Sequence, residues 1–286
     1  MDVLVYKLSF LAFLQALALW SIAGSVGEYA KRLGSGLLVS GMIVPWLTTL
    51  PETIVTIKLA SSGYPIAGLY NCVMSAVFDL FLIAPLIGYK GKERLAPAVF
   101  APVPLLLLAM VHYEGGKAVL EQAVEGVALL AIMFALSLAA SYGPATFNIS
   151  FQGVLELLAA LSALGFASIE FSNTVTALTA AIGSERLGGT LAAILTSLPD
   201  AIYAVRAGLK GSVEEAMAEI SGCIIHDFLE APAIAMIFSK LILYAQDILL
   251  LLAYTIAATV FVAVGRGRQK MVGAILFTAF LLAGIL

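Results

Sequence analysis

Two short runs of residues combine hydroxyl groups, a proline and a carboxylate in the same order. The first is Thr48-Thr49-Leu50-Pro51-Glu52, and the second, Thr196-Ser197-Leu198-Pro199-Asp200, follows it at an offset of 148 residues. An aspartate, Asp79 or Asp227, comes 27 residues after each of these carboxylates. Hydroxyl, carbonyl and carboxylate oxygens are the ligands that hard cations prefer. The chemistry that this repeated pattern offers is therefore cation binding.

The segments around these acids are almost wholly apolar. The 286 residues are 62% hydrophobic, and the mean hydropathy is +1.04, whereas a soluble domain is about 45–50% apolar. Only 12% of the residues are charged and the net charge is -3, which argues against a nucleic-acid partner. We expect the lipid bilayer to surround nearly the whole chain, because each spanning helix needs about 20 apolar residues. Acids inside such segments are costly and usually mark an ion or substrate pathway.

Glycines, prolines and charged residues divide the chain into ten apolar stretches. They cover roughly 3–27, 34–61, 64–89, 95–113, 117–141, 151–183, 187–209, 212–239, 242–264 and 270–286. Five spans precede the second copy of the repeat, so the second half enters the membrane from the opposite side. We predict an all-α polytopic membrane protein of ten transmembrane helices, with a five-helix repeat over 1–141, a short linker over 142–150 and an inverted repeat over 151–286. The stretches are too long and too uniformly apolar for the ~10-residue alternating strands of a β-barrel.

Lysines and arginines predict the orientation. One side carries ten: Lys31, Arg32, Lys90, Lys92, Arg94, Arg206, Lys210, Arg266, Arg268 and Lys270. The other carries five: Lys7, Lys58, Lys117, Arg186 and Lys240. Because cytoplasmic loops are enriched in Lys and Arg, we predict that the first side is cytoplasmic. Both termini are then extracellular, in a multi-pass protein of the plasma membrane.

Each proline predicts a break in its helix, since proline lacks an amide hydrogen and clashes with the preceding turn. Proline also suits the first turn of a new helix. We therefore expect the second and seventh spans to be pairs of half-helices, with carbonyls near Thr48 and Thr49 freed at the first break. The second break repeats this arrangement around Thr196 and Ser197. Non-helical backbone at membrane depth persists only where protein buries it or where it lines a cavity.

The following span in each half carries a polar stripe. Asn71, Ser75 and Asp79 recur at four-residue intervals, and Glu219, Cys223 and Asp227 form the matching stripe, so each set lies on one helix face. We predict that the inverted halves bring breaks and stripes together near the midplane. The centre would hold Glu52, Asp79, Asp200 and Asp227, with Glu219 and Asn71 one or two turns away.

Carboxylates this close cannot all be ionised unless cations or protons neutralise them. A site that must always be filled, by alternatives that exclude one another, is the physical basis of exchange. Other polar residues favour structural interpretations. Glu121, Glu125, Glu156 and Asp247 lie toward predicted span ends, where we expect contact with solvent or lipid headgroups. His226 points to another helix face than Asp227, so we interpret it as a packing residue or as a support for a ligand.

At these positions the chain resembles the cation/calcium antiporter superfamily, particularly its sodium/calcium exchanger branch. That family carries two inverted repeats, each with a Gly-Thr-Ser-Leu-Pro-Glu element followed by a Gly-Asn-x-x-Gly-Ser-Asn-x-x-Asn/Asp element. Here they read Leu47–Glu52 with Gly68–Asp79, and Leu195–Asp200 with Glu219–Asp227. The likeness covers the whole chain and is to the short prokaryotic form without a large cytosolic loop.

The resemblance implies roles for individual residues. Glu52 and Asp200 would be central calcium ligands with the carbonyls of Thr48 and Thr196, and Asp79 and Asp227 would complete the central position. Thr49, Ser197, Ser75 and Cys223 would fall at outer sodium positions. The long first and sixth spans would form a sliding pair that gates access. The chain departs from the family pattern at Asp200, Cys223 and Glu219, and the Gly-Asn-Ala-Val-Glu signature of proton/calcium exchangers is absent, which favours sodium.

We therefore expect a transporter rather than an enzyme, without a cofactor other than the bound ions. It would be a secondary active antiporter that moves Ca²⁺ against Na⁺ or H⁺, with inorganic cations as its partners. One alternative is an exchanger of Mg²⁺ or another divalent cation. Two others are an intramembrane aspartyl hydrolase, with Asp79 and Asp227 as its dyad, and a passive channel. The sequence leaves the oligomeric state open, a monomer included.

Overall fold

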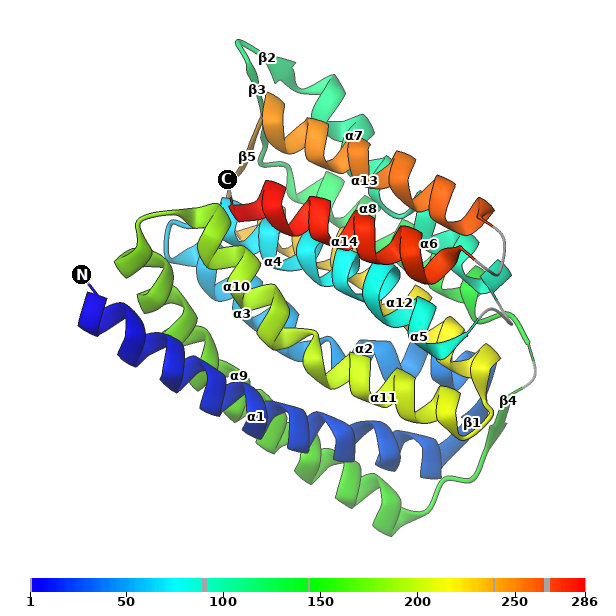
Figure 1. Cartoon of the computed structure of the whole chain (residues 1–286). Helices are drawn as coiled ribbons and strands as arrows, with labels where there is room; N and C mark the ends of the chain where they lie inside the picture. The colour runs from blue at the N-terminus through cyan, green and yellow to red at the C-terminus, as the bar shows by residue number, and fades with distance from the viewer. Residues whose placement is uncertain (1, 89–91, 144, 239, 265–267, 286) are drawn as a thin grey trace.

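Helices dominate the structure. The computed structural model describes residues 2–88, 92–143, 145–238, 240–264 and 268–285 (Figure 1). Within them, seven helical segments are long and apolar enough to cross a membrane: Val3–Leu33, Pro65–Ile87, Glu93–Val111, Ala123–Ala140, Phe151–Ile182, Val213–Ile237 and Ala245–Ala263. Two shorter apolar helical segments are Val39–Thr48 and Gln269–Gly284. The prediction of a multi-pass, mainly helical membrane protein is confirmed.

The elements follow one another in a similar order in the two halves. The first half holds α1 (Asp2–Leu33), β1 (Gly34–Gly36), η1 (Val39–Ile43), α2 (Val44–Thr48), α3 (Leu50–Ser61), α4 (Pro65–Phe78), η2 (Asp79–Ile83), α5 (Ala84–Ile87), η3 (Lys92–Leu95), α6 (Ala96–Phe100), α7 (Pro102–Val111), β2 (Tyr113–Glu114), β3 (Lys117–Leu120) and α8 (Ala123–Ala140). After β4 (Ala145–Phe147) come α9 (Phe151–Ile182), α10 (Glu185–Thr196), α11 (Leu198–Leu209), α12 (Val213–Phe238), β5 (Leu241–Tyr244), α13 (Ala245–Ala263) and α14 (Gln269–Ile285).

Burial separates central helices from peripheral ones. The spans containing α4 and α12 are 89% and 82% buried, whereas those of α1 and α9 are only 17% buried. Helix α4 packs along α10, and α12 contacts α3, α4, α8 and α11. The long helices α1 and α9, of 32 residues each, run side by side along one edge of the molecule (Figure 1). The most polar part of the sequence motifs therefore lies in the centre of the bundle.

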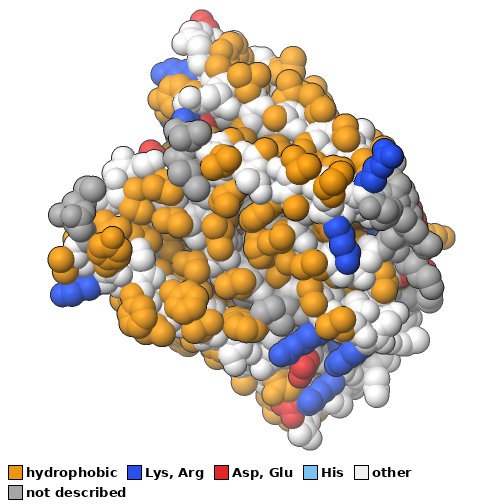
Figure 2. Space-filling model, viewed as in Figure 1, with side chains coloured by type: hydrophobic (Ala, Val, Ile, Leu, Met, Phe, Trp, Pro, Cys, Tyr) orange, Lys and Arg blue, Asp and Glu red, His pale blue; other side chains and the backbone are white. Residues whose placement is uncertain are grey.

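The outer surface is apolar, as a bilayer requires. Large hydrophobic side chains such as Phe10, Phe166 and Val124 are exposed. Figure 2 shows hydrophobic side chains spread over much of one face, with lysines and arginines mainly near its edges. Such a large exposed apolar surface is costly in water and is covered by lipid in a membrane.

Short strands join the ends of some helices, a feature that the all-α prediction did not include. Strand β1 pairs antiparallel with β4, and β3 pairs with both β2 and β5. The apolar stretches at 117–141 and 242–264 therefore both begin within a strand, and their helices start a few residues later. Gly115 and Gly116, with φ of 59° and 87°, form the tight turn between β2 and β3, where two residues with positive φ suit a hairpin.

Candidate cation-binding site

Both proline motifs interrupt a helix at one residue. Thr49 separates α2 from α3 with φ -78° and ψ 2°, and Ser197 separates α10 from α11 with φ -78° and ψ -11°. The amide of Thr49 still donates to the Pro45 carbonyl at 2.9 Å, and that of Ser197 to the Ala193 carbonyl at 3.0 Å. The two interruptions thus have nearly the same backbone angles, and a helical hydrogen bond still reaches each interrupting residue from the helix before it.

The carbonyls at the interruptions are not all free. The carbonyl of Thr49 accepts from the Thr53 amide at 3.1 Å, and that of Ser197 accepts from the Ala201 amide at 3.0 Å. The expectation of a freed carbonyl at Thr49 is therefore wrong. Proline instead removes the helical donor of the carbonyl four residues before it. Those carbonyls belong to Leu47 and Leu195, one residue before Thr48 and Thr196.

The hydroxyl groups of both motifs share one arrangement. Each donates to a carbonyl one turn earlier: Thr48 to Val44 at 3.1 Å, Thr49 to Pro45 at 2.8 Å, Thr196 to Ala192 at 3.1 Å and Ser197 to Ala193 at 2.7 Å. All four are buried. Since a hydroxyl has one proton and two acceptor lone pairs, a committed proton leaves the oxygen able to face a cation.

Contacts between the two halves join the motifs. Ser75 Oγ lies 2.5 Å from Ser197 Oγ, and Thr196 Oγ1 lies 3.3 Å from Asn71 Oδ1. The Asn71 amide also donates to the Glu52 carbonyl and to Thr56 Oγ1, each at 3.4 Å. The stripe on α4 therefore faces the interruption between α10 and α11, as the spacing predicts.

The predicted acids are deeply buried. Glu52, Asp79, Glu219 and Asp227 expose at most 3% of their surface, and Cys223 exposes 1%. The carboxylates of Glu52 and Asp227 lie within electrostatic reach of Cys72, and those of Asp79 and Asp227 within reach of Tyr254. Asp227 therefore shares a nearby side chain with one acid of the first half at Cys72 and with another at Tyr254. The side chain of Asp200 lies outside the described residues.

The described side chains do not form the kind of metal site that is built from several His, Cys, Asp or Glu residues. No three His, Cys, Asp or Glu among them are grouped so that they could hold a metal ion. The oxygens that the contacts between the halves bring together here belong to hydroxyl, amide and carbonyl groups of Ser75, Ser197, Thr196, Asn71 and Glu52. Such a mixed oxygen set fits Na⁺ or Ca²⁺ better than a soft metal.

Comparison with known proteins now places the chain. The family model described as sodium/calcium exchanger protein matches residues 4–142 and 152–286. The chain belongs to this family. It is therefore a transporter, and the interpretation as an aspartyl hydrolase is wrong. No curated protein matches it in sequence.

Solved structures share the fold of this exchanger-family chain. The sodium-calcium exchanger NCX_Mj, soaked with Na⁺ and Ca²⁺, is 18% identical with a TM-score of 0.66, over 96% of this chain and 97% of that one. Native YfkE is 17% identical with a TM-score of 0.68, over 99% of this chain and 98% of that one. At such identity the likeness establishes the common fold.

Three polar residues beside the site were missed by the sequence reasoning or given a minor role. Thr56, one turn after Glu52, contacts Asn71 and lies 3.2 Å from Cys72 Sγ. His226 Nδ1 lies 2.7 Å from Glu230 Oε2, and Glu230 is within electrostatic reach of Cys72. Their matches in the other half are apolar, Ala204 for Thr56, Phe78 for His226 and Leu82 for Glu230. A search for repeated residues could not find them, although their helical spacing from Glu52 and Asp227 was a signal.

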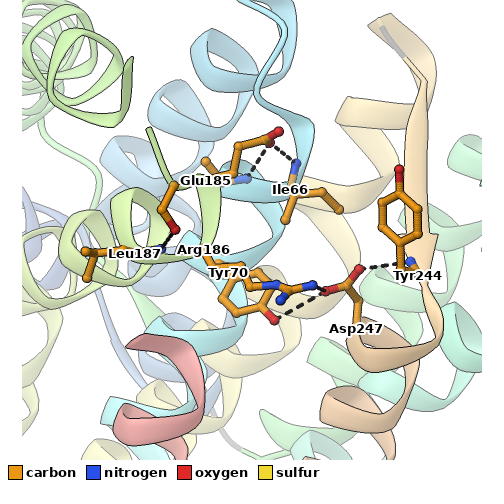
Figure 3. A network of polar contacts seen from close by, with 9 residues as sticks. Ile66, Tyr70, Glu185, Arg186, Leu187, Tyr244 and Asp247 are labelled. Carbon is orange, nitrogen blue, oxygen red and sulfur yellow. Dashed lines mark hydrogen bonds and ion pairs between the residues drawn. The ribbon is translucent and has the colours of Figure 1, made fainter. Parts of the chain in front are cut away.

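A second polar network holds the ends of α4, α10 and α13 together (Figure 3). Asp247 Oδ1 accepts from the Tyr70 hydroxyl at 3.2 Å and from Arg186 at 3.3 Å. Its Oδ2 accepts from the Tyr244 amide at 2.9 Å, which caps α13. Asp247 is fully buried, so the expectation of headgroup or solvent contact is wrong. An arginine that reaches this carboxylate from α10 explains why it is found away from solvent.

The residue before this arginine fixes α4 directly. Glu185 Oε2 accepts from the first-turn amides of Ile66 and Ala67 at 3.0 and 3.3 Å (Figure 3). A carboxylate at a helix N-terminus satisfies amides that lack helical acceptors. Helices α4 and α10, which carry Asn71 and Thr196, are thereby held in register.

Proposed function

We propose that this exchanger-family protein is a secondary active antiporter that moves Ca²⁺ against Na⁺, or against H⁺, by alternating access. The observation that carries the proposal is the buried meeting of the two halves through Ser75 with Ser197 and Asn71 with Thr196. It brings oxygens of opposite halves to one place among buried acids. The ions are the cargo, and no resident cofactor is needed.

The proposed ligands follow from this arrangement. Glu52, Asp79, Asp200 and Asp227 supply the negative charge that a divalent ion requires, with Thr48 and Thr196 beside them. Thr49, Ser75, Ser197 and Cys223 lie toward the sodium positions, with Asn71 and Glu219 in support. Ca²⁺ and Na⁺ compete for the same carboxylates, because the acids cannot all stay ionised when no cation is bound. This competition couples the two fluxes.

The proposed topology is ten spans in two inverted halves, with the second and seventh spans interrupted and both termini extracellular. Contacts between loops support it. Strand β1 pairs with β4, and Lys31 pairs with Glu215 at 3.3 Å; all lie on the side assigned to the cytoplasm. Strand β3 pairs with β5, and Lys240 pairs with Glu121 at 2.9 Å, on the opposite side.

Gating is assigned to α1 and α9, which pack against each other at the edge of the bundle and are mostly unburied. Two helices with so little buried surface can slide over the central helices at a smaller cost than α4 or α12. Their movement exposes the site to one side and then to the other. A pair that bridges both halves also preserves the pseudo-two-fold relation between the two states.

The test is ⁴⁵Ca²⁺ uptake into proteoliposomes under an imposed Na⁺ gradient, an H⁺ gradient or no gradient. We expect uptake that depends on an outwardly directed Na⁺ gradient and saturates with Ca²⁺. Equal uptake without any gradient would identify a channel and refute antiport. Failure of both cation gradients to drive Ca²⁺, with Mg²⁺ moving in its place, would overturn the assigned cargo.

A further inference from the structure

A basic pocket opens at the end of α1 that the charge distribution assigns to the cytoplasm. Its volume is about 440 Å³, and it lies between the ends of α1 and α11 and the start of α12. Its charged lining consists of Glu28, Lys31, Arg32, Arg206, Lys210 and Glu215. Four cationic side chains against two carboxylates leave an excess of two positive charges.

Once ion pairs are counted, Arg206 and Lys210 of α11 remain with Glu28, so the lining keeps one free positive charge. Lys31 forms an ion pair with Glu215, and Arg32 forms one with Glu156, each at 3.3 Å. Arg206 and Lys210 form no ion pair with any residue that the structure describes, and both are exposed. One guanidinium and one ammonium group on one wall of a pocket suit a phosphate group.

The backbone adds to the same field. Helix α12 begins at Val213 and has 26 residues, and Ser212, just before it, lines the pocket. The first amides of a helix lack internal acceptors, and the N-terminal end of the helix dipole is positive. The first turn also carries Glu214 and Glu215, of which Glu215 is paired with Lys31, so the attraction for an anion comes mainly from Arg206 and Lys210.

The position of the pocket decides between a lipid and a soluble anion. Leu209, the residue before Lys210, exposes 83% of its surface, so an apolar side chain is available to lipid next to one of the two cations. Anionic lipids are attracted to basic residues at the cytoplasmic ends of spans. We propose that this pocket binds the phosphate of an anionic phospholipid of the cytoplasmic leaflet, which bridges α1 and α11.

This proposal does not depend on ion exchange and is tested by binding. Purified protein in detergent is titrated with dioleoyl phosphatidylglycerol, dioleoyl phosphatidylcholine or inorganic phosphate, and bound adducts are counted by native mass spectrometry. The variant Arg206→Gln/Lys210→Gln removes both cations of α11. The matched control Lys7→Gln/Lys117→Gln removes the same charge from two exposed lysines on the side assigned to the outside.

We expect phosphatidylglycerol to bind the unmodified protein at least about ten-fold more tightly than phosphatidylcholine. The α11 variant should lose about thirty-fold in phosphatidylglycerol affinity, because each basic residue near anionic lipid contributes about a five-fold factor, and the control should lose less than two-fold. Equal losses in both variants would overturn the proposal, since they would indicate general charge attraction. Inorganic phosphate bound as tightly as the lipid would also overturn it, because the acyl chain would then have no part in binding.

Discussion

The contact between Ser75 and Ser197 offers a direct measurement of whether the two halves share one site. The Ser197 hydroxyl donates to the Ala193 carbonyl at 2.7 Å, so its single proton is not available for a second hydrogen bond. The 2.5 Å contact therefore has Ser75 as the donor and Ser197 as the acceptor. One lone pair of Ser197 remains for a cation, and loss of either serine removes the same bond between the halves.

We predict a non-additive effect of Ser75→Ala and Ser197→Ala. A neutral buried hydrogen bond contributes about 1 kcal/mol net, which corresponds to about a five-fold change in an equilibrium constant. Each single variant should raise the Na⁺ concentration for half-maximal Ca²⁺ uptake about five-fold. The double variant should show little more than one single effect, because the shared bond is lost only once, so the coupling energy is about 1 kcal/mol.

The assay is Na⁺-driven ⁴⁵Ca²⁺ uptake in proteoliposomes, with protein amount and monodispersity checked for each variant. Ser168→Ala is the matched control, because Ser168 is a buried serine of α9 that donates to its own helix at 2.7 Å. Its effect should add to that of Ser75→Ala without coupling. Additive effects of Ser75→Ala and Ser197→Ala would refute a shared site.

Three further predictions concern other parts of the same framework. Glu52→Gln should abolish Ca²⁺ uptake while size-exclusion behaviour stays normal; uptake at the unmodified rate would remove Glu52 from the site. Arg186→Gln should destabilise the protein by about 3 kcal/mol in thermal unfolding, since it leaves a buried carboxylate without its cation, whereas Lys240→Gln, in an exposed pair, should cost less than about 1 kcal/mol. Gly189→Ala should destabilise the protein by about 1–3 kcal/mol, because the new Cβ would collide with the Ala67 carbonyl oxygen. Gly165→Ala, with open space around it, should stabilise the protein slightly. Equal unfolding temperatures of the two glycine variants would contradict this packing.

The sequence was sufficient to indicate a local irregularity at Thr49 and Ser197, because proline acts locally, whereas full breaks into half-helices stay a prediction. The missing amide hydrogen of Pro51 and Pro199 is a covalent fact, and its effect reaches only one turn back. The polar stripe on α4 was also predictable, since spacing along a helix fixes the face that Asn71 and Ser75 share. Their contact with the other half was predicted from an inverted repeat, and the inversion itself stays a prediction.

Features that depend on distant partners were not predictable in this way. The stretch predicted to start a span at Lys117 is a strand up to Leu120, because β3 pairs with β5, more than a hundred residues later. This pairing satisfies the backbone amide and carbonyl groups of the loop. Asp247 was predicted to lie at a span end because its partners, Arg186 and Tyr70, are distant in the sequence. Both errors arise where a local pattern competes with a long-range contact.

The two halves are also less alike than their motifs indicate, and prolines are one of the differences. The π-helical segments η1 and η2 each end two residues before a proline, Pro45 or Pro85. The matching residues in the second half are Ala193 and Ala233, which lie in the α-helices α10 and α12. A proline removes one helical hydrogen bond and crowds the turn before it, but α12 stays α-helical around Pro232, so proline alone does not produce a π segment.

This difference bears on the site, because η2 begins at Asp79 whereas its counterpart Asp227 lies within the regular helix α12. A π turn rotates the residues after it relative to an α-helix, so the segments that follow Asp79 and Asp227 differ in the faces that they present. Glu230 adds a further carboxylate to the second half, where the first half has Leu82. In the proposed site, the symmetric residues would bind the cations, and the asymmetric ones around Asp79 and Asp227 would make its two sides chemically distinct. Such a difference allows one site to hold a divalent ion and smaller competing charges in different positions.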